Sequence, residues 1–193
     1  MQTDKLTIEA AVDKLIDNFV RYKNAKLIKQ GGQMRNLKGK AWQSFFIQGP
    51  IMNAIHNHNL DHIVKAEHRI EIKAPLNISA DAFITNKNNK PLYFIEIKDY
   101  MDIDMYKRFA FDTYLLKEYG CVKFISLCGW VASSSAQCDI VNKYLGYPEL
   151  IHNFTLFPET RTSKNDLFIL SHTREDIIKA TEELTKKLET VIL

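Results

Sequence analysis

A change in hydrophobic period near residue 64 constrains the fold of this 193-residue chain more than any other feature. Before it, apolar residues recur at helical spacing over residues 5–20 and again over 41–56, where Gly49-Pro50 predicts a kink. From Val64 to Lys73, apolar and charged residues alternate almost without error, which is typical of a strand with one buried face. The chain therefore combines a helical first third with a sheet.

The remaining pattern predicts a mixed α/β fold. Strands are expected over 78–85 and 92–98, joined by a turn-rich segment. A helix over 103–119 and a strand over 122–127 then form a crossover, which favours a parallel strand pair. The same criteria predict further elements: a loop over 21–40, a helix near 136–145, strands near 154–157 and 167–170, and a helix over 174–193.

Length and composition fit one globular domain. Apolar residues make up 46% and charged residues 25%, which excludes a disordered or low-complexity chain. A chain of this length is also too short for two large domains. We expect a single domain over 1–193, with a basic helical part over about 1–60, a core over about 62–128 and an α/β part over about 129–193.

The cysteines and the first residues of the chain indicate the cellular compartment in which the protein is expected. Three cysteines without a CxxC pair fit free thiols in a reducing environment better than disulfides. The first residues lack the layout of a signal peptide, and no apolar run approaches the ~18 residues of a membrane span. We therefore expect a soluble cytoplasmic protein with no membrane contact.

Charge is unevenly distributed along the chain. The total of 26 basic and 23 acidic residues gives +3. Residues 18–60, however, carry seven basic and no acidic side chains, which leaves 19 minus 23, or −4, for the rest. A block of one sign is more typical of an interaction surface than of a solvated face, and this one favours a polyanion.

The residues with the clearest chemistry are Asp81, Glu96 and Lys98. Alternate residues of a strand share a face, so Glu96 and Lys98 point the same way, and an antiparallel hairpin brings Asp81 near them. Two carboxylates can share a divalent cation, and Mg²⁺ suits such a site because it keeps several waters and binds phosphate. Lys98 would add positive charge beside an attacking water.

Other interpretations of these and neighbouring residues stay open. Glu96 and Lys98 could simply form an ion pair at a strand end, with Asp81 in a turn or the same pair. His58 and His62 have the i, i+4 spacing that can hold a metal on a helix, although a solvated loop is the simpler interpretation. On the helix after residue 103, the same site could be faced by Tyr106, Lys107, Arg108 and Asp112, although surface solvation is the simpler interpretation of the two basic residues. Asp102 is expected to cap this helix.

The motif resembles that of the PD-(D/E)xK nuclease superfamily, and the chain is similar in size to small type II restriction endonucleases. Fourteen residues separate Asp81 from Glu96-Ile97-Lys98, within the order helix, three strands, helix, strand. The resemblance covers about residues 64–127. It implies a restriction-endonuclease-like core, which is a mixed central sheet flanked by helices. It also implies Mg²⁺-dependent hydrolysis of double-stranded DNA to 5′-phosphate and 3′-hydroxyl ends by a homodimer, with Asp81 and Glu96 as metal ligands and Lys98 beside the water.

Two departures from the family pattern concern the site. Ala80 precedes Asp81 where the motif has proline, and Gln43 stands where many members carry a glutamate on the helix before the sheet. Gln43 could be a neutral substitute, Glu9 or Glu67 could supply the extra carboxylate, or the site could have none. One or two Mg²⁺ ions per site are therefore both open.

Phosphate contacts are expected from the basic block, including Arg35, Lys38 and Lys40. Base contacts are expected from two polar loops, over 133–137 and over 160–165, of which the second contains Arg161 and Lys164. We expect a magnesium-dependent DNA endonuclease of restriction type. The alternatives are a structure-specific or repair nuclease or junction resolvase of the same superfamily, and a non-catalytic DNA-binding protein that keeps the basic surface.

Overall fold

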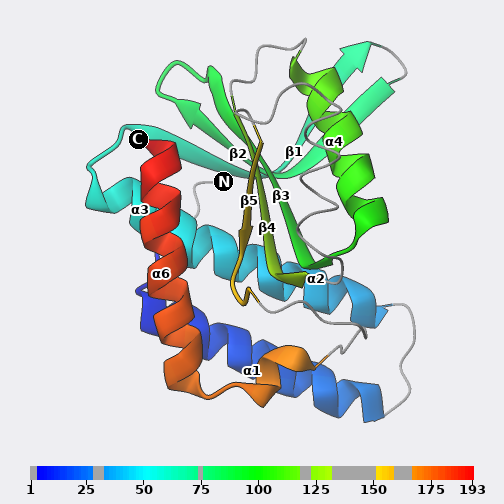
Figure 1. Cartoon of the computed structure of the whole chain (residues 1–193), viewed down its shortest axis with the longest axis vertical. Coiled ribbons are helices and arrows are strands. Elements are labelled where there is room, and N and C mark those ends of the chain that lie inside the picture. The colour runs from blue at the N-terminus through cyan, green and yellow to red at the C-terminus, as the bar shows by residue number, and fades with distance from the viewer. Residues whose placement is uncertain (1–3, 28–32, 74–75, 118–122, 132–150, 159–166) are drawn as a thin grey trace. The chain divides into compact units, whose positions relative to one another are not determined.

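The structure, a computed structural model, describes residues 4–27, 33–73, 76–117, 123–131, 151–158 and 167–193 (Figure 1). The chain forms two compact units. We call residues 61–162 the sheet unit, and residues 4–60 together with 163–193 the helical unit. The two ends of the chain therefore contribute to the same unit, and the sheet unit lies between them in the sequence.

The sheet unit contains a five-stranded mixed sheet in the order β1-β2-β3-β4-β5. β1 to β3 are antiparallel, whereas β3, β4 and β5 run parallel. Its elements are β1 (His62–Lys73), β2 (Leu76–Asn86), β3 (Pro91–Met101), α4 (Ile103–Lys117), β4 (Lys123–Val131) and β5 (Ile151–Thr155). The α4 crossover explains the change of direction, because parallel neighbours cannot be joined by a tight turn.

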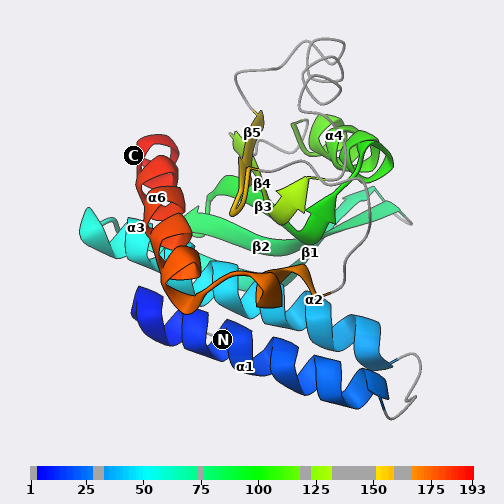
Figure 2. The same ribbon diagram turned by 60° about the horizontal axis from the view of Figure 1, so that its bottom comes forward.

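Helix α4 packs along one face of this sheet (Figures 1 and 2). Tyr106 and Leu116 of the helix are fully buried in a cluster with Phe83, Phe94 and Phe124 from three neighbouring strands. The ring centroids of Phe83 and Phe94 lie 5.4 Å apart, and those of Phe94 and Phe124 lie 5.9 Å apart. Since side chains alternate along a strand, the residues two and four positions after Phe94 share its face.

The β2–β3 hairpin is closed by asparagines. The carboxamide oxygen of Asn86 accepts hydrogen bonds from the backbone N–H groups of Asn88 and Lys90, both at 3.0 Å. Asn89 has φ of +60°, a left-handed conformation that asparagine tolerates better than most residues. This turn fixes which residues of β2 and β3 face each other, and the pairing joins Phe83 to Phe94 and Ala82 to Ile95.

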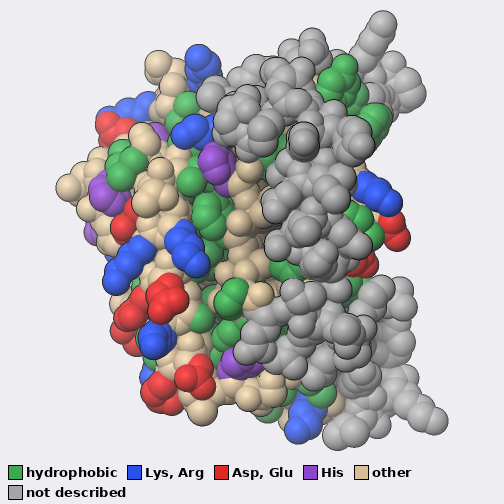
Figure 3. Space-filling view, viewed as in Figure 1, with side chains coloured by type: hydrophobic (Ala, Val, Ile, Leu, Met, Phe, Trp, Pro, Cys, Tyr) green, Lys and Arg blue, Asp and Glu red, His purple; other side chains and the backbone are tan. Residues whose placement is uncertain are grey.

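The helical unit consists of α1 (Ile8–Leu27), α2 (Gln33–Phe46), a π-helical turn η1 (Ile47–Ile51), α3 (Met52–Asn57), a 3₁₀ turn η3 (Phe168–Ser171) and α6 (Arg174–Ile192). Its interior is aromatic: the ring of Trp42 lies 5.6 Å from Phe19 and 5.4 Å from Phe46. Figure 3 shows acidic and basic side chains interspersed over α6, as expected for the outer face of a surface helix.

The predicted kink at Gly49-Pro50 takes the form of η1. Pro50 has no N–H to donate, and the wider π turn accommodates it. The buried side chain of Asn53 supplies a donor here, because its Nδ2 bonds to the carbonyl oxygens of Gly49 at 2.8 Å and Leu6 at 2.9 Å. A Cβ at Gly49 would lie 3.0 Å from the Cβ of Ala11, so glycine permits the close approach of α1.

Two sequence-based predictions about the helical unit are wrong. Most of the expected loop over 21–40 is helical, because α1 continues to Leu27 and α2 begins at Gln33. The buried ring of Tyr22 extends the apolar stripe of α1 beyond Phe19. The strand expected near 167–170 is the 3₁₀ turn η3, since a four-residue apolar run fits either structure.

The predicted strands and the crossover helix of the sheet unit are confirmed with shifted ends. The parallel pairing of β4 is also confirmed. Within β1, Val64 is buried but Ala66 is exposed, so the buried face expected from alternation is interrupted at Ala66; the side chains of His68, Ile70 and Ile72 lie outside the described residues. The helix expected near 136–145 lies outside the described residues. No helix in the described part of the chain combines the length and the apolar character that a membrane span requires.

Candidate active site

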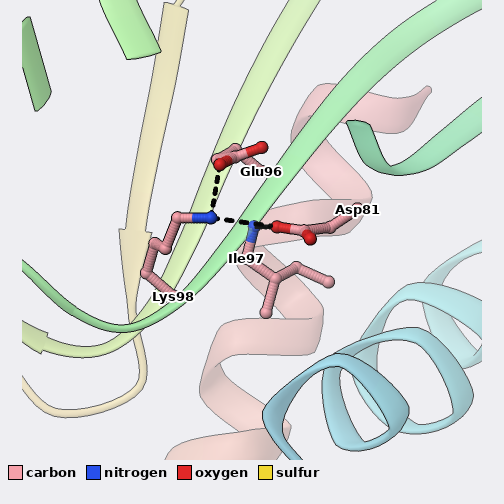
Figure 4. Close-up of polar contacts among 4 residues, drawn as sticks. All are labelled: Asp81, Glu96, Ile97 and Lys98. Atoms are coloured by element: carbon pink, nitrogen blue, oxygen red, sulfur yellow. Dashed lines mark hydrogen bonds and ion pairs between the residues drawn. The ribbon is translucent and has the colours of Figure 1, made fainter. Parts of the chain in front are cut away.

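Three charged side chains converge on the face of the sheet that carries α4. Asp81 comes from β2, and Glu96 and Lys98 lie two residues apart on β3, so both point to the face of Phe94. Figure 4 shows the three side chains directed toward one another. They lie just past the paired residues Ala82 and Ile95. The structure thus brings together the three residues of the predicted motif.

Asp81 is held by the backbone of β3 as well as by Lys98. Its Oδ2 accepts the backbone N–H of Ile97 at 2.7 Å and lies 3.3 Å from the Nζ of Lys98. The ammonium of Lys98 also forms an ion pair with Oε1 of Glu96. One positive charge therefore lies between two carboxylates, and a backbone donor fixes the position of one of them.

The carboxyl group of Glu96 binds a proton unusually tightly. Its side chain is only 18% exposed. Burial, and then the negative charge of Asp81, raise the pKa of Glu96 from 4.5 to about 7, although Lys98 acts in the opposite direction. The lysine alone does not balance the two carboxylates, so the site favours an additional positive charge.

Lys98 keeps its charge in this environment. Burial disfavours the ammonium form, but Glu96 and Asp81 more than offset that cost and raise the pKa of Lys98 above its ordinary value. Its side chain is 33% exposed, so the ammonium is within reach of solvent. It can therefore serve as a fixed cation and hydrogen-bond donor beside the carboxylates.

A further carboxylate acts on the site from α4. Asp112 is half-buried, and its negative charge contributes to the raised pKa of Glu96. Burial raises the pKa of Asp112 itself, while Arg108 and Lys98 oppose that change. Sequence reasoning placed Arg108 and Asp112 toward the site without giving Asp112 a role. Only the rotation of α4 on the sheet distinguishes Asp112 from the exposed Asp104 of the same helix.

Asp102 serves the fold instead. Its Oδ1 accepts the backbone N–H of Met105 at 2.9 Å, which is the expected capping bond at the start of α4. This cap fixes where α4 begins after β3 and so helps to set the position of Asp112 on the helix.

The donor set at the site fits a hard divalent cation with few protein ligands. Asp81 and Glu96 both contact the single ammonium of Lys98, so their oxygens face a common point where positive charge is stabilised. Among the residues that the structure describes, no group of three or more His, Cys, Asp or Glu could hold a metal ion. Two carboxylates are the protein contribution that Mg²⁺ commonly uses, with water and phosphate oxygens as its other ligands.

The three candidates for an extra carboxylate or its substitute either belong to the other unit or have a side chain outside the described residues. Gln43 on α2 and Glu9 on α1 belong to the helical unit. Glu67 lies on β1, and its side chain is outside the described residues. Gln43 is half-buried and Glu9 is exposed.

The basic block predicted to contact DNA is distributed over two helices of the helical unit. Lys40 is exposed and Lys38 half-buried on α2, and the side chain of Arg35 is outside the described residues. The predicted polar loops with Arg161 and Lys164 also lie outside the described residues. DNA binding by these residues stays a prediction.

The structure places the two histidines and one of the cysteines in ordinary structural positions. His58 follows the end of α3, and its Nε2 lies 3.6 Å from Oε2 of Glu189, whereas His62 begins β1, so the two do not share a helix. The helical alternative for this pair is therefore wrong, and residues 58–61 form the loop that was the simpler interpretation. Cys128 is buried on β4 with its Sγ 3.8 Å from the carbonyl oxygen of Phe154, as expected for a structural thiol.

Comparison of the chain with protein-family models, with curated proteins and with solved structures finds no match. Its function must therefore be argued from its own residues.

Proposed function

We propose that this protein is a Mg²⁺-dependent DNA endonuclease of restriction type, with a restriction-endonuclease-like core and a site formed by Asp81, Glu96 and Lys98. The observation that carries the proposal is the convergence of two carboxylates on one ammonium at the centre of a mixed sheet. The basic block of residues 18–60 supports a polyanionic substrate.

An ion pair that only stabilised the fold would be expected to balance its charges. Here Glu96 titrates near neutral pH because burial and Asp81 outweigh Lys98. Strongly shifted groups of this kind gather at functional sites, where a ligand completes the charge balance. A divalent cation would relieve the repulsion between Asp81 and Glu96, and a phosphodiester would supply further oxygen ligands.

Each side chain has a role in this proposal. Asp81, fixed by the N–H of Ile97, and Glu96, once deprotonated, hold the ion. When bound, Mg²⁺ supplies Lewis-acid charge that polarises the phosphoryl group and makes a nearby water a stronger acid. Lys98 donates a hydrogen bond to that water or to a phosphate oxygen and offsets the negative charge that develops on phosphorus.

The resemblance described above adds finer expectations that rest on the same site. The products carry 5′-phosphate and 3′-hydroxyl ends, and two copies of the chain cut the two strands of double-stranded DNA. We also propose that the protein works in the cytoplasm, where a restriction enzyme meets incoming DNA.

The test is digestion of supercoiled plasmid with and without Mg²⁺, with Asp81→Asn as the site variant. Relaxed or linear products that need Mg²⁺ and vanish in the variant would support the proposal. Asp13→Asn is a matched control, because Asp13 also pairs with a cation but lies exposed on α1. Undiminished Mg²⁺-dependent cutting by Asp81→Asn would refute the site.

The same experiment separates the rival functions. Cutting restricted to branched or mismatched DNA would favour a repair nuclease or junction resolvase of the same chemistry. Salt-sensitive binding without turnover in any divalent metal would favour a non-catalytic DNA-binding protein. Sequencing the ends of discrete products would identify a restriction specificity.

A further inference from the structure

A row of polar side chains crosses the parallel strands beside the candidate active site. Glu96 of β3 is paired with Ser126 of β4, and Ser126 is paired with Asn153 of β5. Paired residues of neighbouring strands point to the same face, so the row continues from the carboxylate of Glu96 toward the edge of the sheet. Neighbouring strands lie about 4.8 Å apart, which places Asn153 ~10 Å from Glu96.

The amide of Asn153 is held from two sides by buried groups. The hydroxyl of Ser126 donates to Oδ1 of Asn153 at 2.6 Å, and Nδ2 of Asn153 donates to the hydroxyl of Tyr106 at 3.0 Å. Ser126 is 2% exposed and Tyr106 is fully buried under α4. Asn153 itself is exposed. The row therefore ends in an exposed amide whose orientation is fixed from inside the fold.

We propose that Asn153 binds a backbone phosphate of the nucleic acid close to the bond that is cut. An amide nitrogen carries two N–H groups, and Tyr106 accepts one of them, so the second can donate to a phosphate oxygen. Because the amide is already oriented, binding costs little side-chain entropy. The position of this contact near the cut rests on the proposed function, whereas the contact between Asn153 and a phosphate does not.

The distance along the row gives the register of the contact. Successive phosphates of one DNA strand rise about 3.4 Å along the helix axis. Because the strand also winds around that axis, phosphates lie farther apart in space than this rise, and ~10 Å from Glu96 spans at most about three nucleotides, so Asn153 contacts a phosphate close to the scissile one. Tyr106 and Ser126 are positioning residues, because they act through Asn153 and do not meet the substrate.

A purely structural role for Asn153 makes a different prediction for two variants. Asn153→Asp keeps an oxygen that can accept from Ser126, whereas Asn153→Ala removes it. If Asn153 only satisfies Ser126 and Tyr106, the aspartate variant is the milder of the two. If Asn153 faces phosphate, the aspartate variant is the more severe, because a carboxylate repels the DNA backbone.

The experiment measures Kd for a DNA duplex without divalent metal, and KM and kcat for cleavage with Mg²⁺. Asn153→Ala is expected to raise Kd and KM about tenfold with kcat nearly unchanged, which matches the loss of one hydrogen bond to a charged group. Asn153→Asp is expected to raise both further. Tyr106→Phe removes the hydroxyl that holds the amide of Asn153 and should raise them less, about two- to threefold.

Asn88→Asp is the control for added charge, since Asn88 is exposed in the β2–β3 turn of the same unit. It should leave Kd nearly unchanged. Methylphosphonates are placed one at a time at each of the three phosphates on either side of the cut, and one of them should weaken binding by the wild-type protein about tenfold and binding by Asn153→Ala hardly at all.

The outcomes separate this inference from the proposed function. If the protein cuts DNA but Asn153→Asp is no worse than Asn153→Ala, and no methylphosphonate position depends on Asn153, the inference is overturned and the proposed function stands. If nothing is cut but Asn153→Asp weakens duplex binding far more than Asn153→Ala and Asn88→Asp, the contact stands and the proposed nuclease fails.

Discussion

The two units each contain a carboxylate paired with a cation, and the two pairs differ in what surrounds them. In the helical unit, Arg174 donates to both oxygens of Asp13, at 2.6 and 3.0 Å, on an exposed surface. In the sheet unit, Lys98 lies between the less exposed Asp81 and Glu96. The geometry of the first pair is the better of the two.

The two pairs respond oppositely to protons. The hydrogen bond from Arg174 lowers the pKa of Asp13, so this carboxylate stays charged in any ordinary buffer. Burial raises the pKa of Glu96 to about 7, so this carboxyl group is held back from ionising by the fold. A raised carboxyl pKa weakens an ion pair, so it is not expected where the pair only joins two elements. It is expected at a site where a bound cation stabilises the ionised carboxylate.

The largest expected effect is a loss of cleavage rate when the cation of the sheet-unit pair is removed, with removal of the cation of the helical-unit pair as the control. Lys98→Ala should lower the single-turnover cleavage rate by about 100-fold or more, since it removes a donor aimed at developing negative charge. Arg174→Ala should leave the rate unchanged, because its pair is solvent-screened. Rates would be measured with Mg²⁺ at saturating enzyme. Equal rates for Lys98→Ala and the wild-type protein would show that the sheet-unit pair is structural too.

The next effect is a pH dependence of stability that the sheet-unit pair produces near neutral pH and the helical-unit pair does not. The folded protein holds a proton on Glu96 up to about pH 7, whereas an unfolded chain releases it near 4.5. The folded state therefore binds more protons between these values, and its stability falls as pH rises through this window, by at most about 3 kcal/mol.

Denaturant unfolding at pH 5 and pH 8 measures this fall. Glu96→Gln should remove most of it, because the amide cannot ionise. Asp13→Asn should not change it: the pKa of Asp13 is lowered, so its stabilising effect is lost only as pH falls below about 3.8. A wild-type stability that rises from pH 5 to pH 8 would contradict the raised pKa of Glu96.

A buried amide in the helical unit should affect stability without affecting chemistry. Asn53→Ala removes both hydrogen bonds that Nδ2 makes to the carbonyl oxygens of Gly49 and Leu6 beside the π turn. The loss should be about 1–3 kcal/mol of unfolding free energy, because two hydrogen bonds of a buried side chain are removed. Asn57→Ala, which removes an exposed bond to Glu189, is the control and should cost far less. A large fall in the cleavage rate of folded Asn53→Ala protein would contradict this division of roles.

The site residues on β2 and β3 could be predicted because their placement depends on local rules. Alternation along a strand puts Glu96 and Lys98 on one face, and a short turn returns β2 alongside β3, so that Asp81 arrives beside them. The same rules gave the parallel β4, since a helix of 15 residues separates it from β3.

Other features could not be predicted because they depend on non-local packing. The helix that we expected to end at residue 20 continues to Leu27, because the ring of Tyr22 packs into the core. The charged residues on both sides of Tyr22 do not indicate this burial. Asp112 and Asp104 both lie on α4 and look alike in the sequence. Their difference arises from how α4 rotates on the sheet to bury Tyr106 and Leu116.

The smallest expected effect tests that rotation. Asp112 is one of the negative charges that keep the pKa of Glu96 high, after burial and Asp81. If Glu96 must ionise to hold the metal, the cleavage rate of the wild-type protein rises with pH around 7. Asp112→Asn removes one negative neighbour, so Glu96 ionises more readily, and the midpoint of this rise should move to lower pH by less than about one unit.

Asp104→Asn is the matched control, because Asp104 is exposed on the same helix and pairs with Lys107 at 3.6 Å. Its midpoint should equal that of the wild-type protein. Equal shifts in both variants would mean that net charge, and not the position of Asp112, moves the profile. A shift in Asp112→Asn alone would place its carboxylate in the electrostatic field of the site, together with Asp81, Glu96 and Lys98, and separate it from the surface charges of α4.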